Sequence, residues 1–120
     1  MPQSKKIPVF SSLAMDTTQV FSYKLNANFG FFLQWFWTGL TGTGLIKIYM
    51  STDGIHWSIY PVTDKKNKIL TEIPLTLPED NDGVQLNNFR GDFIKVVFES
   101  SASAGTITAQ MDVQEINNSY

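Results

Sequence analysis

The residues that could perform acid–base or nucleophilic chemistry are few and scattered along the chain. His56 is the single histidine among 120 residues, and the chain contains no cysteine. A histidine acts as a general base only when a nucleophile and an orienting group stand beside it, and no convincing spacing of such groups occurs. We therefore predict no catalytic residues and a non-enzymatic protein, with His56 facing solvent beside a turn.

Oxygen ligands are concentrated in the acidic segment 79–83, Glu-Asp-Asn-Asp-Gly. Calcium sites gather their oxygen ligands in loops of this kind. The EF-hand spacing fails, because Pro78 and Phe89 stand where carboxylate ligands belong. We predict a solvated acidic turn, no metal and no cofactor, with structural calcium in a lectin-like loop as the alternative.

Aromatic side chains are the third chemical resource of the sequence. Trp35, Trp37 and Trp57 are the candidate interface or stacking residues, because aromatic rings offer a large contact area to sugars and to partner proteins. The alternative is that the aromatic residues, which make up 13% of the chain, fill an all-β core.

Charge and apolar patterning argue against two classes of partner. Lys65, Lys66 and Lys68 form a basic loop without interleaved aromatic residues, and the net charge is -2, so we expect no nucleic-acid partner. No run approaches the roughly 20 apolar residues of a membrane span, so we expect no membrane partner. The apolar run at 7–10 is too short for a signal peptide, which favours synthesis and folding in a cytoplasm. We interpret Arg90-Gly91-Asp92, the integrin-binding tripeptide, as a turn.

The segment 29–37 is the element around which the rest must be built. Seven of its nine residues are Phe, Trp or Leu. Aromatic residues fit a pleated strand better than a helix. Because neighbouring strand residues point to opposite faces, both faces of this strand are largely apolar. The pattern predicts a central strand that is covered on both sides.

Further strand signals flank this segment. Alternating or short apolar runs predict strands at 7–14, 18–25, 45–51, 55–60, 69–77, 84–86, 92–99 and 106–114. The Gly/Thr-rich segment 38–44 and the Ser/Ala/Gly-rich segment 100–105 are predicted to be loops. Asp53-Gly54 predicts a tight hairpin turn with a positive φ at Gly54 and a partly buried Trp57 beside it.

These elements predict one all-β domain over residues 1–120, with flexible ends at 1–6 and 117–120. About eight short strands without helical periodicity are typical of an antiparallel two-sheet β-sandwich. We favour a jelly-roll-like sandwich over a closed barrel, because the proline-bearing strands at 7–14 and 69–77 suit sheet edges.

The order of the segments carries a resemblance. The relevant stretches are Phe31-Phe32-Leu33-Gln34-Trp35, the hairpin from Ser51 to Trp57, Phe93-Ile94-Lys95-Val96-Val97-Phe98, and, after a Ser/Ala/Gly turn, Thr106-Ile107-Thr108-Ala109. Over roughly residues 17–115 the chain resembles small all-β virion proteins of tailed bacteriophages. The resemblance implies a capsid auxiliary, head-decoration, head-fibre or tail component without catalytic residues.

We therefore expect a structural or interaction protein of a phage virion, made in the host bacterial cytoplasm, that binds other virion proteins through an oligomeric or lattice interface. The charged fraction is only 17%, and the large aromatic residues exceed what one narrow core takes. We expect a homo-oligomer with some aromatic rings on an outer face. The alternative is a carbohydrate-binding or adhesion module of lectin-like β-sandwich type, whose partner is a glycan.

Overall fold

The computed structural model describes residues 2–25, 28–63, 66–87 and 92–116. These residues form strands and no helix, so none of them belongs to a helix that could cross a membrane. The strands are β1 (Pro2–Ala14), β2 (Gln19–Lys24), β3 (Asn28–Ser51), β4 (Ser58–Ile59), β5 (Val62–Thr63), β6 (Ile69–Leu70), β7 (Ile73–Leu75), β8 (Asp80–Asn87) and β9 (Phe93–Ile116). All pairings are antiparallel. The predicted all-β sandwich is confirmed.

Two strands of 24 residues each, β3 and β9, form the spine of the structure. They pair from Asn28↔Glu115 to Ser51↔Phe93, with register shifts only near Asn28 and within 38–42. The apolar content of both strands explains this length, because each carries an alternating row of large side chains along most of its course.

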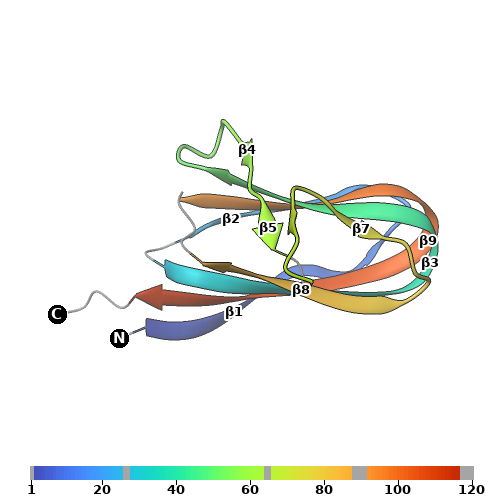
Figure 1. Cartoon of the computed structure of the whole chain (residues 1–120), viewed down its shortest axis with the longest axis horizontal. Helices are drawn as coiled ribbons and strands as arrows, with labels where there is room; N and C mark the ends of the chain where they lie inside the picture. Colours follow the sequence, from blue (N-terminus) through green and yellow to red (C-terminus); the bar gives the residue numbers. More distant parts are fainter. Residues whose placement is uncertain (1, 26–27, 64–65, 88–91, 117–120) are drawn as a thin grey trace.

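Shorter strands extend the spine on both sides. β1 and β2 pair with successive halves of β9, and β8 and β7 pair with successive halves of β3. The resulting sheet doubles back on itself, so that its halves lie one above the other (Figure 1). Layer A contains β1, residues 106–116 of β9, residues 28–38 of β3, and β8. Layer B contains β2, residues 93–99 of β9, residues 44–51 of β3, β7 and β4. The sandwich is thus one folded sheet rather than two separate ones.

The bend lies where loops were predicted, and that prediction is wrong. Residues 38–44 and 100–105 remain within β3 and β9, and Leu40 is buried in the bend. Positive φ angles at Gly39, Gly42 and Gly105 let the strands turn, and their pairing continues beyond the bend after shifts of register between Thr38 and Gly42. Two backbone hydrogen bonds connect neighbouring segments at the bend. Met15 N–H donates to the Gly105 carbonyl (2.9 Å), and Leu40 N–H donates to the Pro78 carbonyl (2.9 Å).

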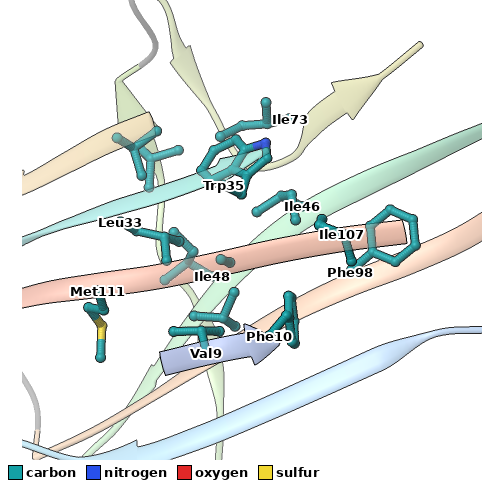
Figure 2. Packing of buried hydrophobic residues seen from close by; sticks show 14 of the residues in the cluster. Val9, Phe10, Leu33, Trp35, Ile46, Ile48, Ile73, Phe98, Ile107 and Met111 are labelled. Atoms are coloured by element: carbon teal, nitrogen blue, oxygen red, sulfur yellow. The ribbon is translucent and has the colours of Figure 1, made fainter. Parts of the chain in front are cut away.

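The core fills the space between the layers (Figure 2). Layer A contributes Leu33, Trp35, Ile107 and Met111, and layer B contributes Ile46, Ile48, Ile94, Val96 and Phe98; all are at most 1% exposed. Each such side chain stabilises the fold by about 1.5–3 kcal/mol relative to an exposed one. The β5–β6 hairpin closes one open edge between the layers by placing Val62 in this core.

Several sequence-based expectations require correction. Segment 29–37 is not covered on both sides, because none of the described residues forms a layer on the outer face of layer A, where Phe32 and Phe36 are 41% and 54% exposed. Residues 2–6, expected to belong to a flexible end, are part of β1 and pair with residues 112–116 of β9. Strand 55–60 shrinks to β4, strand 69–77 divides into β6 and β7, and β8 already begins at Asp80. Residues 1 and 117–120 lie outside the described residues.

Gly44 tests whether the bend depends on close packing. A Cβ atom at Gly44 would overlap the ring of Phe98, which is fully buried and has no room to move aside. We expect Gly44→Ala to lower the free energy of unfolding by about 1–3 kcal/mol, measured by urea denaturation. The neighbouring control Thr43→Ala changes an exposed residue and should cost about 0.5 kcal/mol or less. Equal midpoints for the two variants would contradict this account of the bend.

Candidate functional site

The outer face of layer A presents exposed aromatic rings on an otherwise polar sheet. Cross-strand partners in an antiparallel sheet share a face, so the register defines this surface. Its members are Phe32, Gln34 and Phe36 of β3, Asn81, Gly83 and Gln85 of β8, Thr108, Gln110 and Asp112 of β9, and Lys6 and Pro8 of β1. We call this set the Phe face.

The Phe face is electrically neutral and has an apolar centre. Its two charged residues, Lys6 and Asp112, are opposite each other in the register, and the remaining polar members carry amide or hydroxyl groups. Aromatic rings surrounded by uncharged polar groups are typical of the surfaces that proteins use to bind other proteins. The sequence indicated surplus aromatic residues but did not identify which ones lie outside.

Phe32 and Phe36 differ in their surroundings. A Cβ atom at Gly83 would lie 2.7 Å from Cζ of Phe32, so the Phe32 ring lies across the backbone of β8. Phe32 therefore covers a glycine in the neighbouring strand, and removing it would alter the sheet itself. Phe36 is 54% exposed and is the better probe of binding.

The structure does not bring the three candidate tryptophans together. Trp35 and Trp37 are 0% and 6% exposed and belong to the core. Neither presents a ring face to solvent, and the Trp37 indole N–H donates to the Leu77 carbonyl at 2.8 Å. Trp57 is partly buried, as predicted, on the outer side of layer B. There the Lys95 ammonium lies 4.6 Å from the Trp57 ring centroid and 4.9 Å from that of Tyr49.

The turn between β3 and β4 is organised by Asp53. Its Oδ1 atom accepts hydrogen bonds from the backbone N–H of Ile55 (2.8 Å) and His56 (2.9 Å) and from the Ser51 hydroxyl (2.8 Å). Gly54 has the predicted positive φ, 78°, but residues 52–57 separate the strands, so the predicted tight hairpin is wrong. His56 faces solvent, with Nδ1 2.7 Å from Asp53 Oδ2.

The hydrogen bonds to Asp53 favour its charged form. Led by the bond from the His56 backbone N–H, they hold the pKa of Asp53 well below its ordinary value of 3.8. The side chain therefore acts as a staple for this turn and for the placement of Trp57 above layer B, rather than as a proton donor or acceptor near neutral pH.

A cleft of about 460 Å³ opens between the layers at the edge formed by β7 and β8. We call it the edge cleft. Its lining residues are Trp37, Lys66, Lys68, Leu70, Ile73, Pro74, Thr76, Leu77, Asp80 and Asp82. The acidic segment predicted to be a solvated turn thus supplies two carboxyl groups to this cleft. Each also accepts a local backbone hydrogen bond of 2.8 Å, Asp80 from Asn81 N–H and Asp82 from Gly83 N–H.

One polar atom beneath this region has no hydrogen-bond partner. Trp35 Nε1 is fully buried and makes no hydrogen bond. A buried donor left unsatisfied costs about 1–3 kcal/mol. In Figure 2 the nitrogen lies on the side of the indole ring nearest Ile73, which lines the edge cleft. Asp82, another lining residue, is the register partner of Trp35.

Comparisons with known proteins establish the fold and no family. No family model matches the chain, and no curated protein matches it. The structure is similar to that of the SPBc2 prophage-derived protein YomS, with a TM-score of 0.64, 14% identity and 96% of each chain covered. Weaker likenesses include a structure of infectious bursal disease virus Gx strain (TM-score 0.49, 12% identity, 99% of this chain and 33% of that chain). A CBM4 structure gives a TM-score of 0.47 at 14% identity, over 80% of this chain and 57% of that chain. Both of these TM-scores lie below 0.5, which is too low to establish a common fold.

The lowered pKa of Asp53 predicts a pH dependence of stability. Because the unfolded chain binds this proton more readily than the folded one, the stabilising contribution is complete above about pH 5 and is lost as the pH falls below about 4. We expect Asp53→Asn to flatten the acid limb of a plot of unfolding free energy against pH. Asp16→Asn is the charge-matched control, because Asp16 is exposed and lies outside this turn. If the free energy of unfolding falls equally steeply at acid pH in wild type and in Asp53→Asn, Asp53 does not stabilise this turn through its charged form.

The acidic segment generates a second prediction. Among the described residues no three His, Asp or Glu side chains gather as metal ligands, and Asp80 and Asp82 already accept backbone hydrogen bonds. We expect the melting temperature to be the same in EDTA and in millimolar calcium. A rise of many degrees with calcium would instead support a lectin-like calcium site.

Proposed function

We propose that this chain is a non-enzymatic structural component of a phage virion that works by binding its neighbours through the Phe face. Those neighbours are copies of itself and other virion proteins, and the chain reaches the virion after synthesis in the host bacterial cytoplasm. The observation that carries this function is the exposure of Phe36 and Phe32, 54% and 41%, at the centre of a neutral sheet face.

The physical chemistry of the Phe face supports an assembly. Exposed aromatic rings without a ring of charges are costly for a protein that remains alone in solution, because water must order around them. Burying one such ring at an interface contributes roughly 2 kcal/mol or more. The pairing of Lys6 with Asp112 leaves the face without net charge, so two copies can approach face to face without electrostatic repulsion.

The edges of layer A offer a second means of association. Within the described residues, β1 pairs only with β9 and β8 pairs only with β3. Edge strands expose unpaired N–H and C=O groups and can accept a further strand. Proline at positions 2 and 8 removes donors from β1, so β8 is the edge better suited to strand addition in a lattice.

The fold and the segment pattern support the phage assignment. The structural likeness to the prophage-derived protein spans 96% of both chains, and the order of the strands in the sequence resembles small virion proteins. At 14% identity this likeness concerns the fold alone.

Phe36→Ser tests the assembly. We expect the wild-type protein to self-associate in analytical ultracentrifugation, and Phe36→Ser to weaken the association by roughly 10-fold or more, as loss of a central aromatic anchor does. The matched control is Val20→Ser, because Val20 is 58% exposed but belongs to β2 in layer B. The control should leave the dissociation constant unchanged.

Particles provide the complementary measurement. Cryo-electron microscopy or cross-linking of virions should place the Phe face against a neighbouring chain. A protein that remains monomeric at millimolar concentration, and that is absent from particles, would overturn the proposed function.

A further inference from the structure

We propose that the edge cleft binds a neutral saccharide. This site is separate from the Phe face, because alternate residues of one strand point to opposite faces. Asn81 and Gly83 of β8 belong to the Phe face, whereas Asp80 and Asp82 line the edge cleft. The inference therefore goes beyond the proposed virion role and does not depend on it.

The charges of the edge cleft select the class of ligand. Lys66, Lys68, Asp80 and Asp82 all line the cleft, so the charges of its described lining residues balance. The two carboxylates would repel a polyanion, and the two ammonium groups would repel a polycation. A purely apolar ligand would remove four charged groups from water. A neutral ligand rich in hydroxyl groups fits, because each hydroxyl both donates to a carboxylate and accepts from an ammonium group.

The apolar part of the lining matches the other half of a sugar. The exposed Leu77 and the partly buried Leu70 line the cleft together with the largely buried Trp37 and Ile73, and the C–H groups of a sugar ring can pack on such apolar side chains. The hydrogen bond from Trp37 Nε1 to the Leu77 carbonyl, 2.8 Å long, ties the rim to the core. This part of the lining is thus fixed by a hydrogen bond before a ligand binds, which lowers the entropic cost of binding there.

The unpartnered indole nitrogen of Trp35 is an independent indication of a ligand. It is a fully buried donor without an acceptor, and it lies on the Ile73 side of its ring (Figure 2). Ile73 and Asp82, the register partner of Trp35, both line the cleft. Trp35 itself is not a lining residue of the cleft. We therefore expect its missing acceptor to be a sugar hydroxyl oxygen, or a water molecule held by the sugar, that enters when a side chain beside the cleft shifts on binding.

The size of the cleft sets the length of the ligand. Its volume of about 460 Å³ falls within the roughly 300–1,000 Å³ of small-molecule sites. The cleft therefore suits a short saccharide rather than a long chain enclosed along its whole length.

Nuclear magnetic resonance gives a direct test, because the chain contains three tryptophans and each gives its own indole N–H signal. Maltotriose, N,N′-diacetylchitobiose and a wider panel of neutral oligosaccharides are titrated into ¹⁵N-labelled protein. We expect a saturable shift of the Trp35 and Trp37 indole signals with at least one probe, and no shift of the Trp57 signal. Sialyllactose, an anionic probe, should bind more weakly than its neutral counterpart lactose.

Two variants separate this site from the Phe face. Asp82→Asn keeps an acceptor for Gly83 N–H but removes a charge from the cleft, and should weaken saccharide binding roughly 10-fold. Asp16→Asn, which makes the same chemical change at an exposed position outside the cleft, should bind like wild type. Phe36→Ser should also bind like wild type, so a failed assembly does not affect this test.

Three results would overturn the saccharide site. The first is that no indole N–H signal shifts with any saccharide of the panel at millimolar concentration. The second is that the Trp57 signal shifts over the same saccharide concentrations as the Trp35 and Trp37 signals. The third is that a folded Asp82→Asn protein binds the saccharide with unchanged affinity. Stronger binding of sialyllactose than of lactose would also refute the neutral ligand.

Discussion

The antiparallel ladder between β3 and β9 is the constraint on which the rest of the structure depends. It pairs the two strands from one end of the molecule to the bend and back along the other layer (Figure 1). Because side chains alternate with a period of two, its register decides which residues enter the core. A slip of one residue in layer A would expose Leu33, Trp35 and Trp37 and bury Phe32, Gln34 and Phe36. The same ladder joins the two layers through the bend, so the layers form as one unit.

The sequence predicts those parts of the fold that follow from local alternation. β2, the layer B half of β3 and the layer A half of β9 were correctly predicted, because burial at every second residue is visible within a few positions. The bend was missed, because its glycine, serine and threonine residues are also the residues of loops. Only the partner strand distinguishes a bent strand from a loop, and that pairing joins Thr41 to Ala104, far apart in the chain.

The same distinction explains what could be predicted of the candidate sites. The positive φ of Gly54 depends on its own turn, and that prediction is confirmed. The partial burial of Trp57 is also confirmed, although its ring lies beside Lys95 of the distant strand β9. Trp35 and Trp37 were candidate stacking residues because of their residue type. Exposure depends instead on the position in the strand, which places both tryptophans in the core and the Phe36 ring on the surface. The edge cleft is invisible in the sequence. It unites Trp37 with Leu77, Asp80, Lys66 and Lys68. Of these, Asp80 is brought to Trp37 by the pairing of β8 with β3.

Strand β8 connects the two proposed activities. Its even-numbered residues Asp80 and Asp82 serve the edge cleft, and its odd-numbered residues from Asn81 to Gln85 serve the Phe face. A single edge strand can contribute to both the Phe face and the edge cleft, because neighbouring side chains point to opposite sides of the sheet. A neighbour that covers the Phe face therefore leaves the cleft side of β8 uncovered. An assembled virion protein would in this way keep a small-molecule site at the rim of each copy, and weak binding at single clefts would add up over many copies.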